Sequence, residues 1–516
     1  MTVRKATLAP IIISLWATGC GLSTSQSYQG ESNVFSVFST VDTYITNEMK
    51  AENIPGVAIG IVKDNRIVYL KGYGRSDPSG RLVKNGTPFV IGSITKSFTA
   101  MAVMQQVEVG KIALDAPVQH YLPSFRVVGS PEDSSTYVSS SITVRHLLNQ
   151  TSGLSGSDAY RTAFFTYNGD DALEKTARYY TEGRQLKHPV GKTYAYSNGN
   201  YVILGLIVQK VSGQSYESYV KEHVFAPLSM HNTFTSQEEA IPHGMAMGYR
   251  RWFGFSLPYQ EAPYNRGDLP AGYILSSAED MSHYLIAQLE GGRYGNVSVL
   301  SPAGIDLMHT EPLPGTYAMG WESGAVGGVP VIGHAGGTPG FQSHMWLDTE
   351  RHLGVIVLAN VLSVLDALPK TNVTTATHLA SGVMSLVENR LLPDKGMGPA
   401  QMYWIVDGVL FLLSGWLVIS LAGLTKRYPC LSERSTAGRS IRLRRVIIVF
   451  ILHFIWPSAV LLTAAAGVPL WKVLTLYQPD LLIWLTVVAA VVLLKGIVEM
   501  GLLVRIFRRS RFLKAH

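Results

Sequence analysis

The sequence predicts a mixed α/β (α+β) domain followed by a membrane domain of three transmembrane helices. Two observations predict the first part: strand patterns at residues 56–71 and 342–359, and amphipathic helix patterns around them. A third observation predicts the second part, because three long apolar stretches lie in the last quarter of the 516-residue chain. A chain of this length also exceeds the usual size of one compact core.

Residues 1–30 have the pattern of a secretory signal peptide. A basic start precedes an apolar run at residues 11–17, and small and polar residues follow. Lipidation of Cys20 stays open, because Ala17 stands where lipoprotein signals usually have a larger aliphatic residue. Cys430 is the second of two cysteines, so the exported part between them contains no disulfide and depends on core burial.

The exported domain is predicted to span residues 31–395. It opens with an amphipathic helix at 33–52. Two alternating apolar segments then follow, 56–63 and 66–71, and Asp64-Asn65 between them is typical of a tight hairpin turn.

A second hairpin pattern lies far along the chain. Its strands are predicted at 342–347 and 352–359, with the turn near Asp348. A helix at 373–392 follows, and the Pro- and Gly-rich segment after it predicts a hinge. The pattern predicts the two hairpins but does not show that they pair with each other.

The membrane domain is predicted to span residues 396–516. Its apolar stretches at 402–424, 446–468 and 481–504 can each cross about 30 Å of hydrocarbon as a helix. Lys495 and Glu499 lie one turn apart in the third stretch, and we expect them to pair and to extend toward the nearby cytoplasmic face.

The distribution of basic residues predicts the orientation of these helices. Lysines and arginines crowd the segment between the first two spans and the C-terminal tail, whereas the segment between the second and third spans has only Lys472 and Asp480. Basic loops stay in the cytoplasm, so we expect a multi-pass protein of the bacterial cell membrane with an extracytoplasmic domain and a cytoplasmic C-terminus. Because residues 31–400 are net acidic, the high isoelectric point reflects membrane topology and not nucleic-acid binding.

One short motif predicts the chemistry. Ser93 and Lys96 form an S-x-x-K sequence at the start of an apolar helix pattern, Ser97 to Val109. Such a helix is buried, and burial lowers the pKa of a lysine, so its free amine can take the proton of a serine hydroxyl. The motif alone is weak, because Ser218 and Lys221 match it too.

Two further motifs strengthen this interpretation. Tyr196-Ser197-Asn198 follows about one hundred residues after the serine, and His334-Ala335-Gly336 follows later, with Gly337 next to it. With these motifs and their order, the chain resembles the serine penicillin-binding proteins and class C β-lactamases, a family that includes D-Ala carboxypeptidases, esterases and D-amino-acid peptidases. The resemblance covers residues 35 to 390, including Thr143 to Leu154 and Ala271 to Met281.

The resemblance implies a fold and a set of roles. The fold is β-lactamase/transpeptidase-like, with an antiparallel sheet between helices and a mostly helical lobe. Ser93 is then the nucleophile of an acyl-enzyme, and Lys96 and Tyr196 share the proton transfers. We expect a nearby Lys96 to lower the pKa of the Tyr196 phenol and the two groups to titrate as one unit.

The resemblance also assigns substrate contacts. Asn198 binds the substrate amide or orients the lysine, and the N–H groups of Ser93 and Gly337 stabilise the oxyanion. Gly336 and Gly337 allow the backbone to approach the substrate closely. His334 stands where β-lactamases usually have a lysine, so we expect weaker binding of a substrate carboxylate.

These roles predict a hydrolase that acts on a D-amino-acid amide, with peptidoglycan peptides as the default substrate. The domain order also resembles peptidases that remove an N-acyl-D-asparagine cap from secondary-metabolite precursors, although Val90 replaces the acidic residue of that group. A β-lactamase, a promiscuous esterase and a non-catalytic β-lactam sensor are the alternatives. The chain lacks H-E-x-x-H, G-x-x-x-x-G-K-[ST] and G-x-S-x-G, and we expect neither a metal nor a cofactor.

Overall fold

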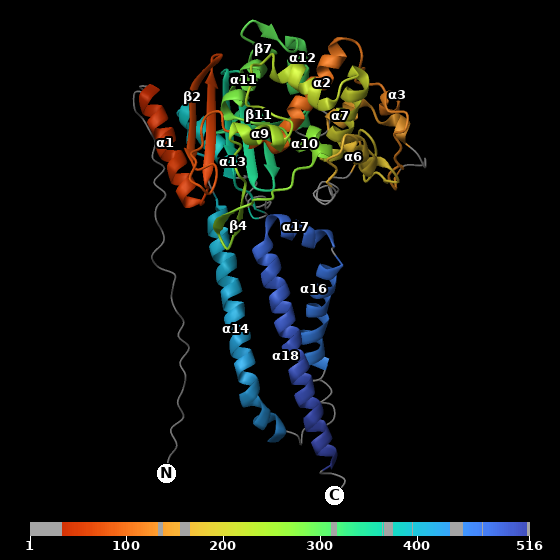
Figure 1. Ribbon diagram of the computed structural model, residues 1–516, viewed down its shortest axis with the longest axis vertical. Coiled ribbons are helices and arrows are strands. Elements are labelled where there is room, and N and C mark those ends of the chain that lie inside the picture. Colours follow the sequence, from red (N-terminus) through yellow and green to blue (C-terminus); the bar gives the residue numbers. More distant parts are fainter. Residues whose placement is uncertain are drawn as a thin grey trace.

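The computed structural model describes most of the chain, including both predicted hairpins, the three motifs and the C-terminal helices. The predicted signal peptide with Cys20 lies outside the described residues, which are 34–132, 138–154, 166–310, 317–363, 365, 375–394, 396–433, 447–466 and 468–512. Figure 1 shows a domain of sheet and helices at one end and a group of long helices extending from it.

A seven-stranded antiparallel sheet forms the centre of the domain, with the strand order β2-β1-β13-β12-β11-β10-β9. Its strands are β1 (Gly56–Lys63), β2 (Arg66–Gly74), β9 (Tyr317–Ala318), β10 (Trp321–Val326), β11 (Val329–Thr338), β12 (Phe341–Asp348) and β13 (Leu353–Ala359). Three short antiparallel pairs lie outside it: β3 (Phe89–Val90) with β6 (Leu275–Ser276), β4 (Tyr249–Trp252) with β5 (Phe255–Pro258), and β7 (Arg293–Tyr294) with β8 (Val297–Ser298).

Both predicted hairpins are present. Asp64 and Asn65 have φ angles of 47° and 62°, and asparagine and aspartate tolerate this left-handed conformation better than most residues. The two hairpins also pair with each other, because β1 aligns antiparallel with β13 from Val57 opposite Ala359 to Lys63 opposite Leu353. The first and last strand patterns of the domain therefore share one sheet.

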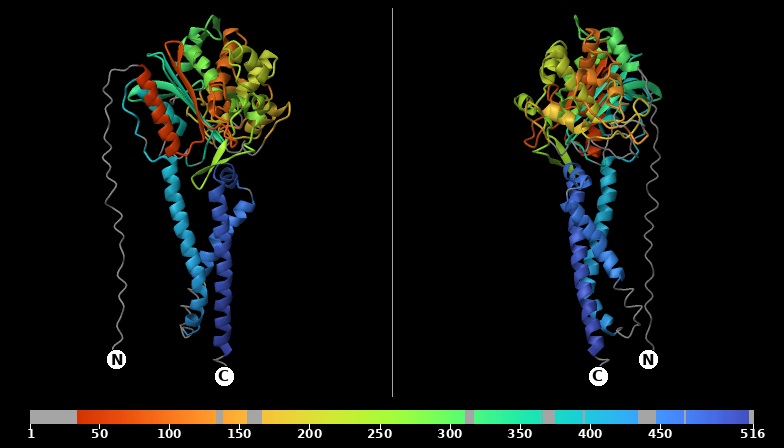
Figure 2. Two further views of the ribbon diagram at one scale, coloured as in Figure 1. Left: turned by 60° about the vertical axis from the view of Figure 1, so that its left-hand side comes forward. Right: turned by 90° about the vertical axis from the view of Figure 1, so that its right-hand side faces the viewer.

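The sheet is covered by helices on both faces. Ile59 and Ile61 pack with α1 (Val34–Ala51) and α13 (Thr375–Val387), whereas Ala58 and Val62 belong to the larger core on the opposite face with α11 (Ala278–Leu289). Because both faces are buried, β1 is apolar at nearly every position rather than alternating. The two further views in Figure 2 show the same layered arrangement.

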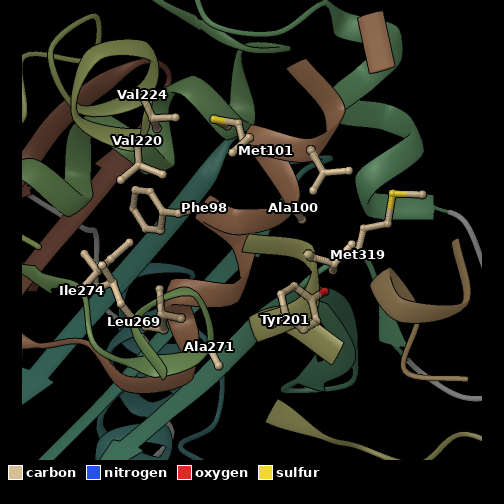
Figure 3. Packing of buried hydrophobic residues seen from close by; sticks show 14 of the residues in the cluster. Phe98, Ala100, Met101, Tyr201, Val220, Val224, Leu269, Ala271, Ile274 and Met319 are labelled. Carbon is tan, nitrogen blue, oxygen red and sulfur yellow. The ribbon is translucent and has the colours of Figure 1, made fainter. Parts of the chain in front are cut away.

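The remaining helices of the domain form a lobe beside the sheet, centred on the buried helix α2. They are α2 (Thr95–Glu108), α3 (Val118–Tyr121), α4 (Val144–Leu148), α6 (Ala172–Thr181), α7 (Asn198–Ser212), α8 (Tyr216–Val220), α9 (Gln237–Ala240), α10 (Leu269–Gly272) and α12 (Pro302–Thr310). Phe98 of α2 stacks on Tyr284 with ring centroids 4.0 Å apart, and it lies near Val220, Val224 and Ile274 in Figure 3. This packing fixes the helix that follows Ser93.

The C-terminal helices match the predicted spans. Within the described residues, three segments are long and apolar enough to cross a membrane: Pro399–Gly423, Ile447–Ala465 and Pro479–Arg505. They lie in α14 (Pro399–Glu433), in a segment that ends with α16 (Trp456–Ala465), and in α18 (Pro479–Phe512). A short helix that the sequence analysis did not predict, α17 (Pro469–Tyr477), connects α16 to α18 near the domain that contains the sheet (Figure 1).

The predicted charged pair in the third span is present, and it also contacts a neighbouring helix. Lys495 and Glu499 do pair, with Nζ and Oε1 3.7 Å apart. Lys495 is nevertheless buried, and its Nζ donates a hydrogen bond of 2.6 Å to Ser420 on α14. The lysine therefore pairs with Glu499 as predicted and also connects α18 to α14, where a nearby hydroxyl satisfies it inside the bundle.

Candidate active site

Ser93 lies on a sharp turn at the start of the buried helix. Gly92, with a φ angle of 54°, precedes it, and Gly92–Ile94 form a single 3₁₀ turn that leads into α2. A left-handed φ is easily adopted only by glycine, so this turn needs Gly92. Ser93 is half-buried, whereas nearly all of α2 from Thr95 to Met104 is buried. A substrate can therefore reach the serine but not the helix behind it.

Lys96 is fully buried one helical turn after the serine. Its Nζ lies 3.0 Å from the Ser93 Oγ, 2.8 Å from the Asn198 Oδ1 and 2.5 Å from the Ala271 carbonyl oxygen. Burial lowers the pKa of Lys96 to about 7, although the carboxylates of Asp268 and Glu322 partly oppose this shift. A large fraction of the lysine is therefore uncharged at neutral pH.

The three contacts of Lys96 match the valence of an uncharged amine. Such an amine has two N–H donors and one lone pair. The carbonyl of Ala271 and the side-chain oxygen of Asn198 can only accept, so they take the two N–H groups. The lone pair then points to the third neighbour, Ser93, whose hydroxyl can donate its proton. The geometry thus places a basic nitrogen against the Ser93 hydroxyl.

Tyr196 also reaches Ser93. Its phenol hydrogen-bonds with Ser93, and the Lys96 Nζ lies 4.8 Å from the centre of its ring. The expected effect of the lysine on its pKa is wrong. Burial raises the pKa of Tyr196 well above its usual value, and the hydrogen bond to Ser93 opposes this only in part. The phenol is therefore protonated at neutral pH and can act as a proton donor.

A glutamine positions the loop that carries Tyr196 and Asn198. The Gln150 side-chain oxygen accepts hydrogen bonds from the Ser197 N–H, at 2.9 Å, and from the Asn200 amide, at 2.5 Å. Its backbone carbonyl accepts a third from the Ala195 N–H, at 2.8 Å. Gln150 has a φ angle of 58°, a strained value for a residue other than glycine, asparagine or aspartate. This contact explains why the Thr143 to Leu154 segment belongs to the site.

The glycines of the third motif, Gly336 and Gly337, lie directly against the 3₁₀ turn that contains Ser93. A Cβ atom on Gly92 would be 2.4 Å from the Gly337 backbone nitrogen, and one on Gly336 would be 2.1 Å from the Ile91 carbonyl oxygen. Ser343 on β12 donates a 2.7 Å hydrogen bond to the same carbonyl. The sheet edge and the turn are thus held together. The backbone of Gly337 lies against Gly92, the residue directly before Ser93.

His334 is buried beneath this edge and is already occupied. Its Nδ1 lies 2.6 Å from the Ala335 carbonyl, and its Nε2 lies 3.2 Å from the Tyr317 hydroxyl. We assign the proton to Nδ1, because a carbonyl can only accept, and the hydroxyl then donates to Nε2. Burial lowers the pKa of His334, with a further contribution from Lys96, so the ring is neutral at pH 7.

The structure adds residues that the sequence analysis did not assign to the site. The Ala271 carbonyl contacts Lys96, and the Tyr317 hydroxyl contacts His334. The carboxylates of Asp268 and Glu322 favour the charged form of Lys96. No sequence signal marks a backbone carbonyl or a tyrosine of this kind. Among the residues that the structure describes, no group of three or more His, Cys, Asp or Glu side chains could hold a metal ion.

The chain is similar in sequence to known proteins that belong to one family. The family described as Beta-lactamase matches residues 41–376. Protein flp of Staphylococcus aureus (strain MW2) is 31% identical over 327 residues, which are 63% of this chain and 63% of flp. Penicillin-binding protein 4 of Amycolatopsis lactamdurans is 28% identical over 312 residues, which are 57% of this chain and 77% of that protein. The chain thus aligns with less than two thirds of the length of flp.

A solved structure has the same fold. The octameric penicillin-binding protein homologue from Pyrococcus abyssi superposes with a TM-score of 0.58 at 28% identity, covering 69% of this chain and 79% of the other. The predicted fold, an antiparallel sheet between helices with a helical lobe, is therefore confirmed. The family match ends at residue 376, before the three apolar helices.

Proposed function

The chain belongs to the β-lactamase family of penicillin-binding-protein-like serine hydrolases, and from this premise we propose that it is a membrane-anchored peptidase specific for D-amino-acid amides. One observation carries the proposed chemistry: the Nζ of Lys96, with a pKa of about 7, lies 3.0 Å from the Oγ of Ser93. A buried, largely uncharged amine in contact with a hydroxyl is the arrangement that makes a serine nucleophilic.

The proposed reaction has two halves. The Ser93 Oγ attacks the amide carbon while Lys96 takes its proton, and the N–H groups of Ser93 and Gly337 stabilise the oxyanion. Tyr196 then gives its phenolic proton to the leaving nitrogen and receives the proton held by Lys96, and the C–N bond breaks. In the second half, water attacks the acyl-enzyme and gives a proton to the same pair, and the Ser93 oxygen leaves as a hydroxyl.

The environment of His334 supports a substrate without a free carboxylate at this position. The ring is neutral, and its two nitrogens are engaged by Tyr317 and by the Ala335 carbonyl. A carboxylate would therefore gain little from it and would also approach the negative charge of Glu322. This favours an internal D-amino-acid amide, as in a peptidoglycan cross-link or an N-acyl-D-amino-acid cap, over a C-terminal D-Ala.

The decisive experiment compares substrates that differ only in this carboxylate. The full-length enzyme in detergent is assayed with a D-Ala-D-Ala peptide as the free acid and as the C-terminal amide, and with an N-acyl-D-Asn amide. We expect a higher kcat/KM for the two amides. A clear preference for the free acid would contradict the proposed specificity but leave the Ser93 chemistry intact.

A β-lactamase and a sensor give different results in the same preparation. β-lactams carry a carboxylate, so nitrocefin should be hydrolysed slowly, and p-nitrophenyl esters report esterase activity. Stable labelling by a fluorescent penicillin without turnover of any amide or ester would indicate a sensor instead of a peptidase. Efficient nitrocefin hydrolysis with no amide cleavage would indicate a β-lactamase.

A further inference from the structure

A cavity lies where the catalytic domain meets the apolar helices. It has a volume of about 450 Å³ and lies between the turn of the β4–β5 hairpin and the first turns of α14 and α18. Its walls include Phe253 and Phe255 from the hairpin, Trp404, Asp407 and Phe411 from α14, and Trp484 from α18. Figure 1 shows the hairpin extending from the domain to the ends of these helices.

The walls of this cavity are connected by buried hydrogen bonds. The Phe253 N–H donates a 2.8 Å bond to the Asp480 carboxylate at the start of α18. Gln478 donates to the same carboxylate, at 3.2 Å, and to the Tyr403 hydroxyl on α14. Both Asp480 and Gln478 are buried. The hairpin and the two helices therefore form one unit, and the cavity between them is a fixed part of the fold.

The turn residue Phe253 is an unusual choice at its position. Phe253 and Gly254 form the two-residue turn between β4 and β5, with φ angles of 45° and 76°. Asparagine, aspartate or glycine is favoured at both positions of such a turn, and a bulky side chain there is strained. Backbone strain of this kind persists where the side chain has a role. Here the side chain of Phe253 forms a wall of the cavity.

The cavity lies at the first turns of two candidate membrane spans, Pro399–Gly423 and Pro479–Arg505, which the proposed membrane placement puts near the outer surface of the bilayer. Asp407 is eight residues after Pro399, the first residue of α14, which corresponds to about 12 Å along the helix. Trp404 is 80% exposed, and Trp484 also lines the cavity. Tryptophan is enriched where the headgroups of lipids meet their acyl chains. An amphiphile in the outer leaflet can therefore enter the cavity from the side.

Asp407 presents a carboxyl group to this cavity. Across the part of the chain that the structure describes, no lysine, arginine or histidine forms an ion pair with it, and it is only half-buried. An ionisable residue within a membrane-spanning helix is costly and usually serves a function. A carboxylate accepts hydrogen bonds and attracts cations, so the complementary group is an ammonium. Leu410 and Phe411 offer apolar surface next to it.

We propose that this cavity binds an aminophospholipid of the outer leaflet, with the headgroup ammonium on Asp407 and an acyl chain along Leu410, Phe411 and Trp484. The inference rests on the membrane placement in the proposed function, but it does not depend on the reaction at Ser93. An ammonium headgroup satisfies the carboxylate, and an acyl chain fills the apolar part of the same cavity.

Native mass spectrometry of the full-length protein tests this site. The protein is titrated with phosphatidylethanolamine and with phosphatidylglycerol of identical acyl chains. We expect one phosphatidylethanolamine to bind about tenfold more tightly, as one charge-assisted hydrogen bond allows. Asp407→Asn should remove this preference, and Asp407→Glu should restore it. Equal affinity of the wild-type protein for the two lipids, or a preference that survives Asp407→Asn, would overturn the proposal.

A second pair of variants tests the place of binding. Leu410→Trp should narrow the cavity and weaken the binding of both lipids, whereas Leu412→Trp, on a position of the same helix that is 71% exposed, should leave binding unchanged. Similar lipid affinities in these two variants would contradict the site. The Ser93→Ala variant should bind phosphatidylethanolamine like the wild type, so a failure of the proposed hydrolysis is distinguishable from a failure of lipid binding.

Discussion

The candidate active site and the junction of the β4–β5 hairpin with α14 and α18 each contain an ionisable group in a poorly solvated place, but the contacts of the two groups differ. At the active site, Lys96 is fully buried and its contacts with Ser93, Asn198 and Ala271 account for every donor and the lone pair of the free amine. At the junction, Asp480 is fully bonded within the protein, whereas Asp407 faces a cavity. The contacts of Lys96 are all within the protein, and its burial there lowers its pKa toward neutrality. The carboxyl group of Asp407 instead lines a cavity, where a ligand can contact it.

Removing the proposed nucleophile, Ser93, should change the activity more than any other substitution considered for these two regions. Ser93→Ala deletes the group that the free amine of Lys96 activates, so we expect kcat to fall by about 10⁴-fold or more. The control is Ser218→Ala in the second S-x-x-K, where Ser218 is exposed on the surface near Ser215. Initial-rate kinetics with an amide substrate measure both variants. Substantial activity in Ser93→Ala, or equal losses in both variants, would refute the mechanism.

Gly92→Ala should disturb the seam between the turn and the sheet. The added Cβ would lie 2.4 Å from the Gly337 nitrogen, and the residue would retain a φ of 54°. We expect kcat to fall about 10²- to 10³-fold, as for loss of an oxyanion donor.

The matched control for this change is Gly110→Ala. Gly110 has a φ of 73° with no atom within 4 Å of an added Cβ, so it carries the backbone strain without the clash. Its variant should lose some thermal stability but keep its kcat. If the two alanine variants lost activity equally, strain alone would explain the effect.

Asp480→Ala should loosen the junction without changing the chemistry. It leaves the Phe253 N–H without its carboxylate partner, and an unpaired buried group typically costs about 1–3 kcal/mol. We expect faster amide hydrogen exchange in the hairpin at 249–258 and an unchanged kcat with a water-soluble ester. Asp394→Ala, at an exposed turn, is the control. An unchanged rate of amide hydrogen exchange in the hairpin would show that the hydrogen bond from Phe253 to Asp480 does not hold the hairpin against α18.

The smallest expected effect is a shift in the pH profile. The free amine of Lys96 is the active form, so kcat/KM should rise with pH through about 7 and then level off. Glu322 favours the charged form, and Glu322→Gln should therefore lower the pKa of Lys96 and move the rising limb to lower pH. A shift to higher pH in this variant would show that Lys96 is not the titrating base.

Local patterns predicted those parts of the molecule that depend on neighbouring residues. Asp64-Asn65 predicted its turn, and the apolar run after Lys96 predicted a buried helix, although the serine itself lies in a 3₁₀ turn before it. The three motifs predicted which side chains would meet, and Ser93, Lys96, Tyr196 and Asn198 do lie together.

Contacts between distant segments could not be predicted in this way. The Ala271 carbonyl has no signature in the sequence, because every residue has one. The pKa of Tyr196 depends on how much water the fold excludes, which outweighs its hydrogen bond to Ser93. The β4–β5 hairpin meets α18 across 227 positions of sequence, so neither its partner Asp480 nor the cavity beside it was visible from local pattern.

The bond between the β4–β5 hairpin and α18 also connects the candidate active site to the apolar helices. The hairpin starts beside Gly340, which lies in the turn after β11, the strand that holds Gly337, so the edge beside Ser93 and the helix α18 are connected through a few residues. If the apolar helices span a bilayer, as we propose, the edge beside Ser93 would keep a constant height and tilt above it. Molecules embedded in the adjacent leaflet would then reach this edge by lateral diffusion in two dimensions, whereas dissolved molecules would have to approach it from one fixed direction.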